Sequence, residues 1–428
     1  MKILYVCRLL SGLESSMLEA QWRPQGAPAI YKMMETLDCG PGEVRFILTS
    51  RKAGPEDTSE WKERSDREVS VEGLRNPVCT LAGEGYFPKW TGRFRGYLSE
   101  LRQLIRIVRE RVRFKPDVAY FDRANVIVAG VMARFFRVSV VLRIMGVTPN
   151  MHEFIAGRRP FEWLVRWAYR SPFALVVCTL DGSGGEEWMK KILLPSVPRL
   201  QLFNGVEISG RPSQMDPRLE LLPRDKSIVL FLGRLEPVKD CDIFIDAALR
   251  LWDTHRDRLH VLVVGYGSRE KELLERIESA GAGEMFTFID RLPHSQVAGA
   301  FTRADIYVSL NRMGNMSNAN LEAMAYGCCI VVPESRTGSG IDVDTDRLIP
   351  ADAVLRVSHE NPTESLAGAL ADLCDRPDKR DSYARNAVRL SKNLLTGWPE
   401  RIDREIELLF QIARGEAPLL PDGQGEHR

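Results

Sequence analysis

Short apolar runs recur along the whole chain, and longer polar or amphipathic segments separate them. Runs of this length, rich in Val, Ile, Leu and Phe, predict β-strands that are buried on both faces. In the first half of the chain they span residues 3–7, 44–49, 118–121, 138–144 and 174–179. In the second half they span residues 228–232, 260–264, 286–289, 306–310 and 328–332. Such strands, separated by helical segments, predict parallel sheets covered by helices, which is an α/β fold.

The segments between the strands divide into helices and loops. Apolar residues at helical spacing predict helices over residues 29–37, 242–252, 295–302, 319–326 and 399–414. The polar segment that links the first strand to the first helix is expected to be a loop. The charged segment 51–70 is poor in apolar residues and is expected to be an exposed loop.

The length of the chain predicts two domains, because 428 residues are more than one hydrophobic core usually spans. A polar stretch punctuated by proline, 209–226, has the composition of a linker. We expect an N-terminal domain over 1–208, a C-terminal domain over 209–395 and a terminal helix within 396–416. Residues 1–209 hold 31 Lys+Arg and 23 Asp+Glu, whereas the remainder holds 28 and 35. A basic half and an acidic half indicate domains with different partners.

Cysteine and histidine usage limits the chemistry. The eight cysteines are scattered without a C-x-x-C spacing, and the chain has six histidines. Neither a disulfide framework nor a metal site is indicated, and a reducing, cytoplasmic compartment fits. No window approaches the ~18 apolar residues of a membrane-spanning helix. No nucleic-acid partner is expected.

The stretch from 305 to 333 shows the repeating unit most clearly. A strand, 306–310, is followed by a loop rich in Gly and Asn, 311–317, and then by a helix that Asn318 caps and Gly327 ends. Strand, loop, helix and strand form a βαβ unit, and this loop lies at the carboxyl end of its first strand. Open α/β sheets bind ligands at that edge, where free N–H groups of a helix attract anions.

Charged side chains near two such loops are candidate ligand contacts. Glu322 shares a helix face with Asn318, and its carboxylate could accept hydrogen bonds from sugar hydroxyls. The alternative is a solvated glutamate in an ordinary crossover helix. Arg234 and Lys239 lie on the loop after the strand 228–232, where two cations could converge on a diphosphate. The alternative is solvent-exposed charge.

Strands of the first half also end in polar or flexible residues. Arg143, Met145 and Gly146 lie at the end of one strand, and Arg123 and Asp181 follow two others. Residues at the carboxyl ends of parallel strands share one edge of the sheet, so they could line a ligand-binding cleft. Ion pairing at strand ends is the alternative for Arg123, Arg143 and Asp181.

Residues 89–115 form the most basic segment, with nine Lys/Arg against Glu100 and Glu110. Its apolar residues recur at helical spacing: Leu98, Leu101, Leu104, Ile105 and Val108. The pattern predicts a helix with one apolar face and basic flanks. The helix could serve only to pack on the sheet. Alternatively, it could also meet anionic lipid headgroups or an acidic acceptor.

Three motifs together resemble the nucleotide-sugar glycosyltransferases of the GT-B fold, specifically glycosyltransferase family 4. The first is Gly233-Arg234-Leu235 followed by Lys239, and the second is the Asn204-Gly205-Val206 turn. The third is Leu321-Glu322-Ala323-Met324-Ala325-x-Gly327, which runs into an apolar strand. The similarity is continuous from about residue 200 to 335. It implies two Rossmann-like, doubly wound domains that face a cleft, and a C-terminal helix that crosses back to the first domain.

The resemblance also implies roles for individual residues. Arg234 and Lys239 would stabilise the departing diphosphate, and Glu322 would bind the ribose of the nucleotide. The other donor-binding residues would be Gly233, Arg291, Leu292, Gly314, Asn315, Met316, Ser317 and Asn318. The acceptor side of the cleft would be formed by Gly26, Arg143, Met145 and Gly146. Such enzymes retain anomeric configuration and typically need no metal, so the expected partners are a nucleotide sugar and a glycan, lipid-linked or small-molecule acceptor.

Two positions depart from the family pattern. Gly314 stands where family members usually have a first glutamate, and Met145 stands where many have a histidine. Main-chain N–H groups with Asn311, Asn315, Ser317 or Asn318 would then have to read the sugar. The expected function is a retaining glycosyltransferase of bacterial surface polysaccharide or glycolipid synthesis, cytoplasmic or peripheral at the inner membrane face. The alternatives are a nucleotide-sugar epimerase on the same fold and a non-catalytic scaffold protein.

Overall fold

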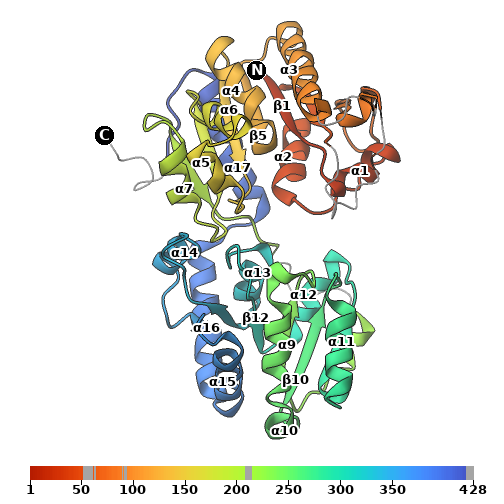
Figure 1. Ribbon diagram of the computed structural model, residues 1–428, viewed down its shortest axis with the longest axis vertical. Coiled ribbons are helices and arrows are strands. Elements are labelled where there is room, and N and C mark those ends of the chain that lie inside the picture. Colours follow the sequence, from red (N-terminus) through yellow and green to blue (C-terminus); the bar gives the residue numbers. More distant parts are fainter. Residues whose placement is uncertain (52–60, 62–63, 89, 91–93, 208–214, 421–428) are drawn as a thin grey trace. The chain divides into compact units, whose positions relative to one another are not determined.

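The structure is a computed structural model that describes the chain except for residues 52–60, 62–63, 89, 91–93, 208–214 and 421–428 (Figure 1). The described residues form two compact units. Unit 1 contains Met1–Thr179, Glu186–Leu202 and the chain from Pro399 onward, and unit 2 contains Leu180–Gly185 and Phe203–Trp398. Among the described residues, no helix combines the length and the apolar character needed to cross a bilayer.

Within the part of the chain that the structure describes, unit 1 holds an eight-stranded sheet in the order β3-β4-β2-β1-β5-β6-β7-β8. Its strands are β1 Lys2–Arg8, β2 Glu43–Thr49, β3 Arg67–Val69, β4 Val78–Leu81, β5 Val118–Asp122, β6 Ser139–Ile144, β7 Leu175–Thr179 and β8 Arg199–Leu202. All paired strands are parallel except β3 and β4. The helices wholly or mostly in this unit are α1 Ser11–Leu18, α2 Pro28–Cys39, α3 Arg95–Phe114, α4 Val126–Phe135, α5 Met151–Ala156, α6 Pro160–Tyr169, α7 Gly185–Ile192 and α17 Trp398–Ala413.

Unit 2 holds a parallel sheet in the order β11-β10-β9-β12-β13-β14. Its strands are β9 Ser227–Leu232, β10 Leu259–Val264, β11 Phe286–Ile289, β12 Ile306–Val308, β13 Cys329–Pro333 and β14 Val354–Val357. Its helices are α8 Pro217–Glu220, α9 Cys241–Leu249, α10 Trp252–His255, α11 Glu270–Ser279, α12 His294–Arg303, α13 Asn318–Tyr326, α14 Val343–Leu348, α15 Pro362–Asp375 and α16 Pro377–Leu394. Short 3₁₀ turns in the two units are η1 Glu84–Tyr86, η3 Arg123–Asn125, η4 Pro237–Lys239 and η5 Gly283–Met285.

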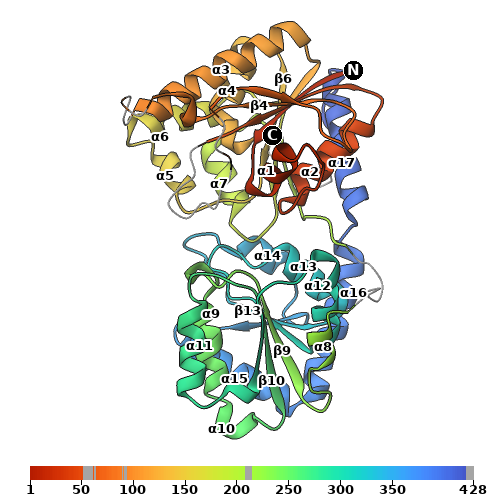
Figure 2. The same cartoon turned by 90° about the vertical axis from the view of Figure 1, so that its right-hand side faces the viewer.

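Helices cover both faces of the unit 2 sheet (Figure 2). One hydrophobic core joins α9, α11 and α15 to the sheet, and a second core joins α12, α13 and α16 to its other face. The strand order runs outward in opposite directions from β9 and β12, which are direct neighbours. The carboxyl ends of these two strands are therefore the topological switch point, where doubly wound sheets bind ligands.

A buried ionic cluster fastens α17 to the sheet of unit 1. Glu405 Oε2 accepts a hydrogen bond of 2.7 Å from Arg401, and Glu405 Oε1 accepts one of 2.6 Å from the Tyr120 hydroxyl. Arg143 Nε lies 4.0 Å from Glu405 Oε1. The Glu405 and Arg143 side chains are 1% and 0% exposed, and the positive charge of Arg143 helps to keep the pKa of Glu405 below its usual value despite burial. Removing one partner would leave a buried charge uncompensated.

The structure corrects several local predictions. The polar segment after the first strand contains α1, and β3 lies within 51–70, most of which is outside the described residues. Ser317, rather than Asn318, is the N-cap of α13, although Gly327 ends that helix in a left-handed conformation as predicted. Three of the strands absent from the prediction, β4, β8 and β14, are short and follow charged or proline-containing sequence. Their pairing depends on neighbours far along the chain, which local pattern does not report.

Candidate functional site

Two loops meet at the switch point of unit 2. The loop after β9 carries Arg234 and Lys239, and the loop after β12 runs from Ser309 to Ser317. The Arg312 amide donates a hydrogen bond of 3.0 Å to the Val238 carbonyl, which ties the loops together. The candidate donor residues from separate stretches of sequence are thus brought to one edge of the sheet.

Arg234 and Lys239 form no ion pair with a carboxylate among the described residues. The positive charge of Arg234 does reach Glu236 on the same loop, whose pKa is lowered mainly by hydrogen bonds from Ser268 and in smaller part by Arg234. Burial lowers the pKa of the Lys239 ammonium, and the positive charge of Arg234 lowers it further. The two cations therefore lie close enough to repel each other, as expected of residues that share an anionic ligand. Arg234 is exposed, but Lys239 is half-buried rather than fully exposed as predicted.

The N-terminus of α13 offers unused hydrogen-bond donors beside these cations. The N-cap residue, Ser317, makes no side-chain cap hydrogen bond. Within the described part of the chain, no partner is recorded for the amides of Ser317, Asn318, Ala319 and Asn320. The Ser317 hydroxyl donates to Asn320 Oδ1 at 2.6 Å, and Asn204 Nδ2 donates to Asn318 Oδ1 at 2.7 Å. Free amides and the helix dipole at this end favour a phosphate group.

Glu322 lies on the buried side of α13 and is 8% exposed. Burial raises the pKa of its carboxyl to about 7, with a further contribution from the negative charge of Glu207. A buried carboxyl with a raised pKa lacks hydrogen-bond donors around it. A ligand hydroxyl that donates to it would stabilise the ionised form. The alternative of a solvated glutamate is therefore wrong.

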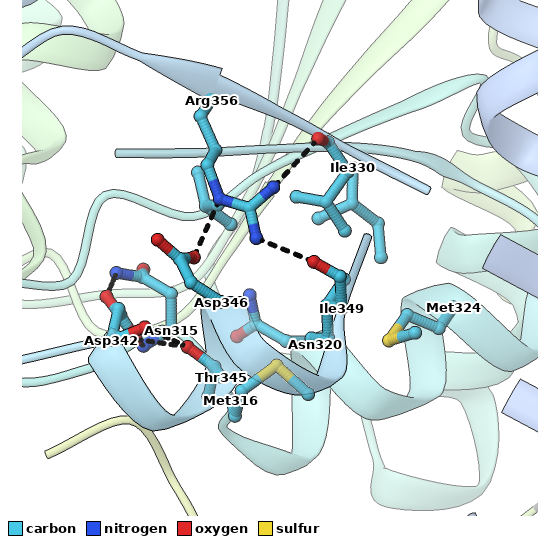
Figure 3. A pocket seen from close by; sticks show the side chains of 12 residues that line it. Asn315, Met316, Asn320, Met324, Ile330, Asp342, Thr345, Asp346, Ile349 and Arg356 are labelled. Atoms are coloured by element: carbon cyan, nitrogen blue, oxygen red, sulfur yellow. Dashed lines mark hydrogen bonds and ion pairs between the residues drawn. The ribbon is translucent and has the colours of Figure 1, made fainter. Parts of the chain in front are cut away.

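The structure corrects the prediction that the Asn315 side chain reads the sugar. Asn315 is 3% exposed. Its side-chain oxygen accepts from Ser309 Oγ and the Asn311 amide, at 2.9 and 3.0 Å, and its nitrogen donates to Asp342 Oδ2 at 2.7 Å. The Asp342 carboxylate also accepts a hydrogen bond of 2.8 Å from the main-chain amide of Asn315 (Figure 3). The buried Asn315 side chain therefore stabilises the conformation of the loop instead of facing a ligand.

Gly314 leaves no room for the carboxylate that the family pattern would place there. Its φ is +117°, a conformation that side chains rarely adopt. A Cβ at this position would lie 2.5 Å from the Gly182 carbonyl carbon and 2.6 Å from the Asp181 carbonyl oxygen. The Met316 amide donates to that same Asp181 oxygen at 3.1 Å. Because the amides of Asn315 and Met316 are engaged within unit 2, those of Ser317 and Asn318 are better placed to meet a ligand.

The remaining donor-side residues flank this site. Met316 is 4% exposed and packs in the hydrophobic core. The Arg291 guanidinium lies 4.8 Å from the Tyr266 ring centroid, and the Arg291 carbonyl accepts a hydrogen bond of 3.3 Å from Arg218. Leu292 is buried, and Gly233 has open space where a Cβ would lie. Nucleotide contacts by Arg291, Leu292 and Gly233 stay predictions.

The predicted acceptor residues lie in unit 1 and divide into two kinds. Arg143 is completely buried, donates to Thr179 at 2.9 Å and faces Glu405, so its assignment to the acceptor site is wrong and the ion-pair alternative holds. Gly26 lies in the loop before α2 with a φ of 61°, and Gly146 lies in the loop after β6 with a φ of 110°. Met145 is partly exposed. Their part in acceptor binding stays a prediction.

Sequence reasoning missed a cavity in unit 1. It has a volume of about 210 Å³ and lies at the carboxyl ends of β1 and β2. Its polar lining includes Arg8, Ser11, Glu14, Ser50 and Arg51. Arg8, at the end of the first strand, is a sequence signal for a polar site at this edge. The sequence pattern predicts a loop where α1 contributes Ser11 and Glu14, so it does not place these two residues in the cavity.

The sequence is similar to known glycosyltransferases. Residues 214–389 match the family described as glycosyl transferases group 1. Alpha-D-kanosaminyltransferase from Streptomyces kanamyceticus is 23% identical over 346 residues, which cover 76% of this chain and 86% of that protein. Phosphatidyl-myo-inositol mannosyltransferase from Mycobacterium tuberculosis is 28% identical over 231 residues, or 53% of this chain and 51% of that protein.

Solved structures share the architecture. Sucrose-phosphate synthase from Thermosynechococcus elongatus aligns with a TM-score of 0.68 and 14% identity, covering 97% of this chain and 100% of that one. HepE from Anabaena, in complex with UDP, aligns with a TM-score of 0.65 and 15% identity, covering 96% and 100%. The two parallel-sheet α/β units have the GT-B fold, as predicted. With the family match and the named relatives, the comparisons support a glycosyltransferase enzyme.

Proposed function

We propose that this protein is a retaining glycosyltransferase of family 4 that takes its sugar from a nucleotide sugar. The acceptor would be a glycan, a glycolipid or a small molecule, in the synthesis of a bacterial surface polysaccharide or glycolipid. The observation that carries the proposal is the pair Arg234 and Lys239, which makes no ion pair among the described residues and lies on a loop at the same sheet edge as the uncapped N-terminus of α13. HepE, a structural neighbour, is in complex with UDP.

The chemistry follows from where charge develops. When the bond between the sugar and the diphosphate breaks, negative charge grows on the leaving phosphate oxygens. Arg234 and Lys239 would meet this charge with positive groups already in place, and the amides of Ser317 and Asn318 would add hydrogen bonds. Glu322 would hold the ribose hydroxyls. No metal ion is part of the proposal, because the two side chains supply the charge that a metal would otherwise supply.

One experiment tests the proposal against its alternatives. The protein is screened by thermal shift with nucleotides and nucleotide sugars, and the best nucleotide sugar is then incubated with candidate acceptors. We expect stabilisation of about 2.7 kcal/mol when the ligand is at ~100 times its dissociation constant, and release of nucleoside diphosphate during turnover. Binding without release of diphosphate would favour a scaffold protein. Conversion of the intact nucleotide sugar to its epimer would favour the epimerase.

We also propose a cytoplasmic enzyme that contacts anionic membrane through residues 89–115. In α3 the buried residues are Ser99, Gln103 and Ile107, whereas Leu98, Leu101 and Ile105 are exposed. Leu104 and Val108 pack partly on the core beside the buried Ile107, so the helix packs on the sheet and also exposes part of its apolar stripe. Packing on the sheet does not use Leu98, Leu101 and Ile105, which remain available to a membrane.

The exposed surface extends from α3 onto α6. The Tyr97 ring on α3 contacts Phe161 on α6 edge to face at 6.3 Å, and the neighbouring Trp163 is more than half exposed. Arg102 and Arg106 pair with Asp66, but Arg109 is not among the ion pairs recorded in the described chain. Aromatic and aliphatic side chains beside arginines are suited to the headgroup region of an anionic bilayer.

Vesicle binding tests the membrane contact. We expect binding to rise with the fraction of anionic lipid and to fall with salt, because the attraction is screened. The double change Leu101→Ser and Ile105→Ser should weaken binding roughly tenfold, because less apolar surface enters the bilayer. Leu274→Ser, on an exposed helix of unit 2, is the matched control. Binding that ignores both lipid charge and salt would return α3 to a purely structural role.

A further inference from the structure

A cavity of unit 2 lies outside the candidate donor site. It has a volume of about 350 Å³ and opens between the N-termini of α9 and α15, at the carboxyl ends of β12, β13 and β14. Arg234, Lys239 and Glu322 do not line it. The polar residues in its wall are Asp240, Arg312, Arg336, Ser358 and His359. The volume lies within the range of roughly 300–1,000 Å³ that small-molecule pockets usually have.

Arg336 supplies a cation that the His359 side chain holds in place. Arg336 Nε and Nη2 each lie 3.3 Å from a ring nitrogen of His359, Nε2 and Nδ1 respectively. His359 Nε2 also lies 2.5 Å from the Glu334 carbonyl oxygen, so the ring itself is fixed against the main chain. No carboxylate pairs with the Arg336 guanidinium among the described residues. Its orientation is therefore fixed while its charge remains available to a ligand.

Another part of the wall is an ion pair that includes Asp240, the residue after Lys239. Arg312 Nη2 and Nε donate to Asp240 Oδ1 at 2.5 and 2.8 Å, and Asp240 is buried. Two arginines against one aspartate leave the wall with an excess of one positive charge. The N-terminus of α15, whose N-cap Asn361 makes no side-chain cap hydrogen bond, adds positive potential at the same edge.

We propose that this cavity binds the phosphate group of a small phosphorylated molecule, with Arg336 as the principal contact and Arg312 as the second. The planar guanidinium presents paired N–H groups that match phosphate oxygens. The cavity is larger than a phosphate ion, so the remaining volume would hold the body of a ligand of sugar-phosphate size. This site is separate from the proposed diphosphate clamp, and its occupancy does not depend on glycosyl transfer.

The test uses the full chain with its donor site saturated by the nucleoside diphosphate that stabilises it most. Glucose 6-phosphate, inorganic phosphate and glucose are then titrated calorimetrically. We expect glucose 6-phosphate to bind more tightly than inorganic phosphate, and glucose not to bind. Arg336→Gln should weaken glucose 6-phosphate binding roughly tenfold or more. Arg250 is an exposed arginine at the C-terminal end of α9, so the control Arg250→Gln should not weaken binding.

Further variants separate this proposal from the proposed function. Arg312→Gln, which leaves the contact between Arg336 and His359 intact, should also weaken binding, and Arg336→Lys should retain part of it. Nucleoside diphosphate affinity should be unchanged in both Arg336 variants. Binding of glucose 6-phosphate that survives in folded Arg336→Gln and Arg312→Gln would overturn the proposal. So would the absence of binding by the wild-type protein at 10 mM of either phosphate probe, roughly the weak limit of specific recognition. Failure of the diphosphate to bind would refute the donor site alone, and the titration would then proceed without it.

Discussion

Nucleotide affinity should depend on pH through Glu322. Burial raises the pKa of its carboxyl to about 7 in the unliganded protein, and ribose hydroxyls donate stronger hydrogen bonds to the ionised form than to the protonated one. By the usual titration relation, roughly a tenth of the carboxyl is ionised at pH 6 and roughly nine-tenths at pH 8. Because the ionised form binds more tightly, the affinity should be lower at pH 6 than at pH 8, by up to about tenfold.

Calorimetry with the bare nucleoside isolates this effect, since the nucleoside has ribose hydroxyls but no phosphate that titrates in the same range. Glu322→Gln should bind with an affinity that hardly changes between pH 6 and pH 8, because glutamine does not ionise. Wild-type affinity that is equal at the two pH values would refute the assignment of Glu322 to the ribose. A pH dependence that persists in Glu322→Gln would place the titrating group elsewhere.

The same carboxyl makes a prediction about stability. Its pKa is raised in the folded state, so the folded state holds the proton more tightly than the unfolded chain does. The stabilisation is fully present below pH 4.5 and is lost as the pH rises from 4.5 to about 7. The loss amounts to about 3 kcal/mol. Glu322→Gln should therefore gain stability relative to wild type between pH 4.5 and pH 8, measured by urea unfolding without ligand.

Four other substitutions test the loops of unit 2. Arg234→Ala and Lys239→Ala should each keep a near-native melting temperature but lose about 100-fold in turnover, with a larger loss of diphosphate than of nucleoside binding; normal turnover would refute the clamp. Gly314→Glu should not supply the family's missing carboxylate and should cost about 3 kcal/mol or more in urea unfolding, because the backbone of Gly182 is 2.5 Å from the new Cβ; Gly338→Ala, which meets nothing within 4 Å, should be nearly neutral. Asn315→Ala should cost roughly 3–5 kcal/mol, the sum of several buried hydrogen bonds, and a loss below 1 kcal/mol would show that the loop does not need this anchor.

The sequence by itself determined the α/β class and the two series of strands. Buried parallel strands are continuous apolar runs, and their helices are amphipathic, so both are written in local pattern. It also placed Arg234, Lys239 and Glu322 on loops or helices at strand ends, because parallel βα units put every such loop at one edge of the sheet. The left-handed end of α13 at Gly327 followed from glycine chemistry alone.

Only the tertiary structure decided which way the side chains face and what they contact. Asn315 has a side chain that could contact a ligand, yet its side-chain amide donates to Asp342 and stabilises the loop. Arg143 has the sequence position of a cleft residue, yet it is buried against Glu405, which lies far along the chain on α17. The apolar residues of α3 form a regular stripe, but how much of a stripe turns toward the core depends on what the sheet offers. Here the buried side carries Ser99 and Gln103 beside Ile107, while Leu98, Leu101 and Ile105 are exposed. These outcomes rest on contacts between residues distant in sequence, and local periodicity carries no information about them.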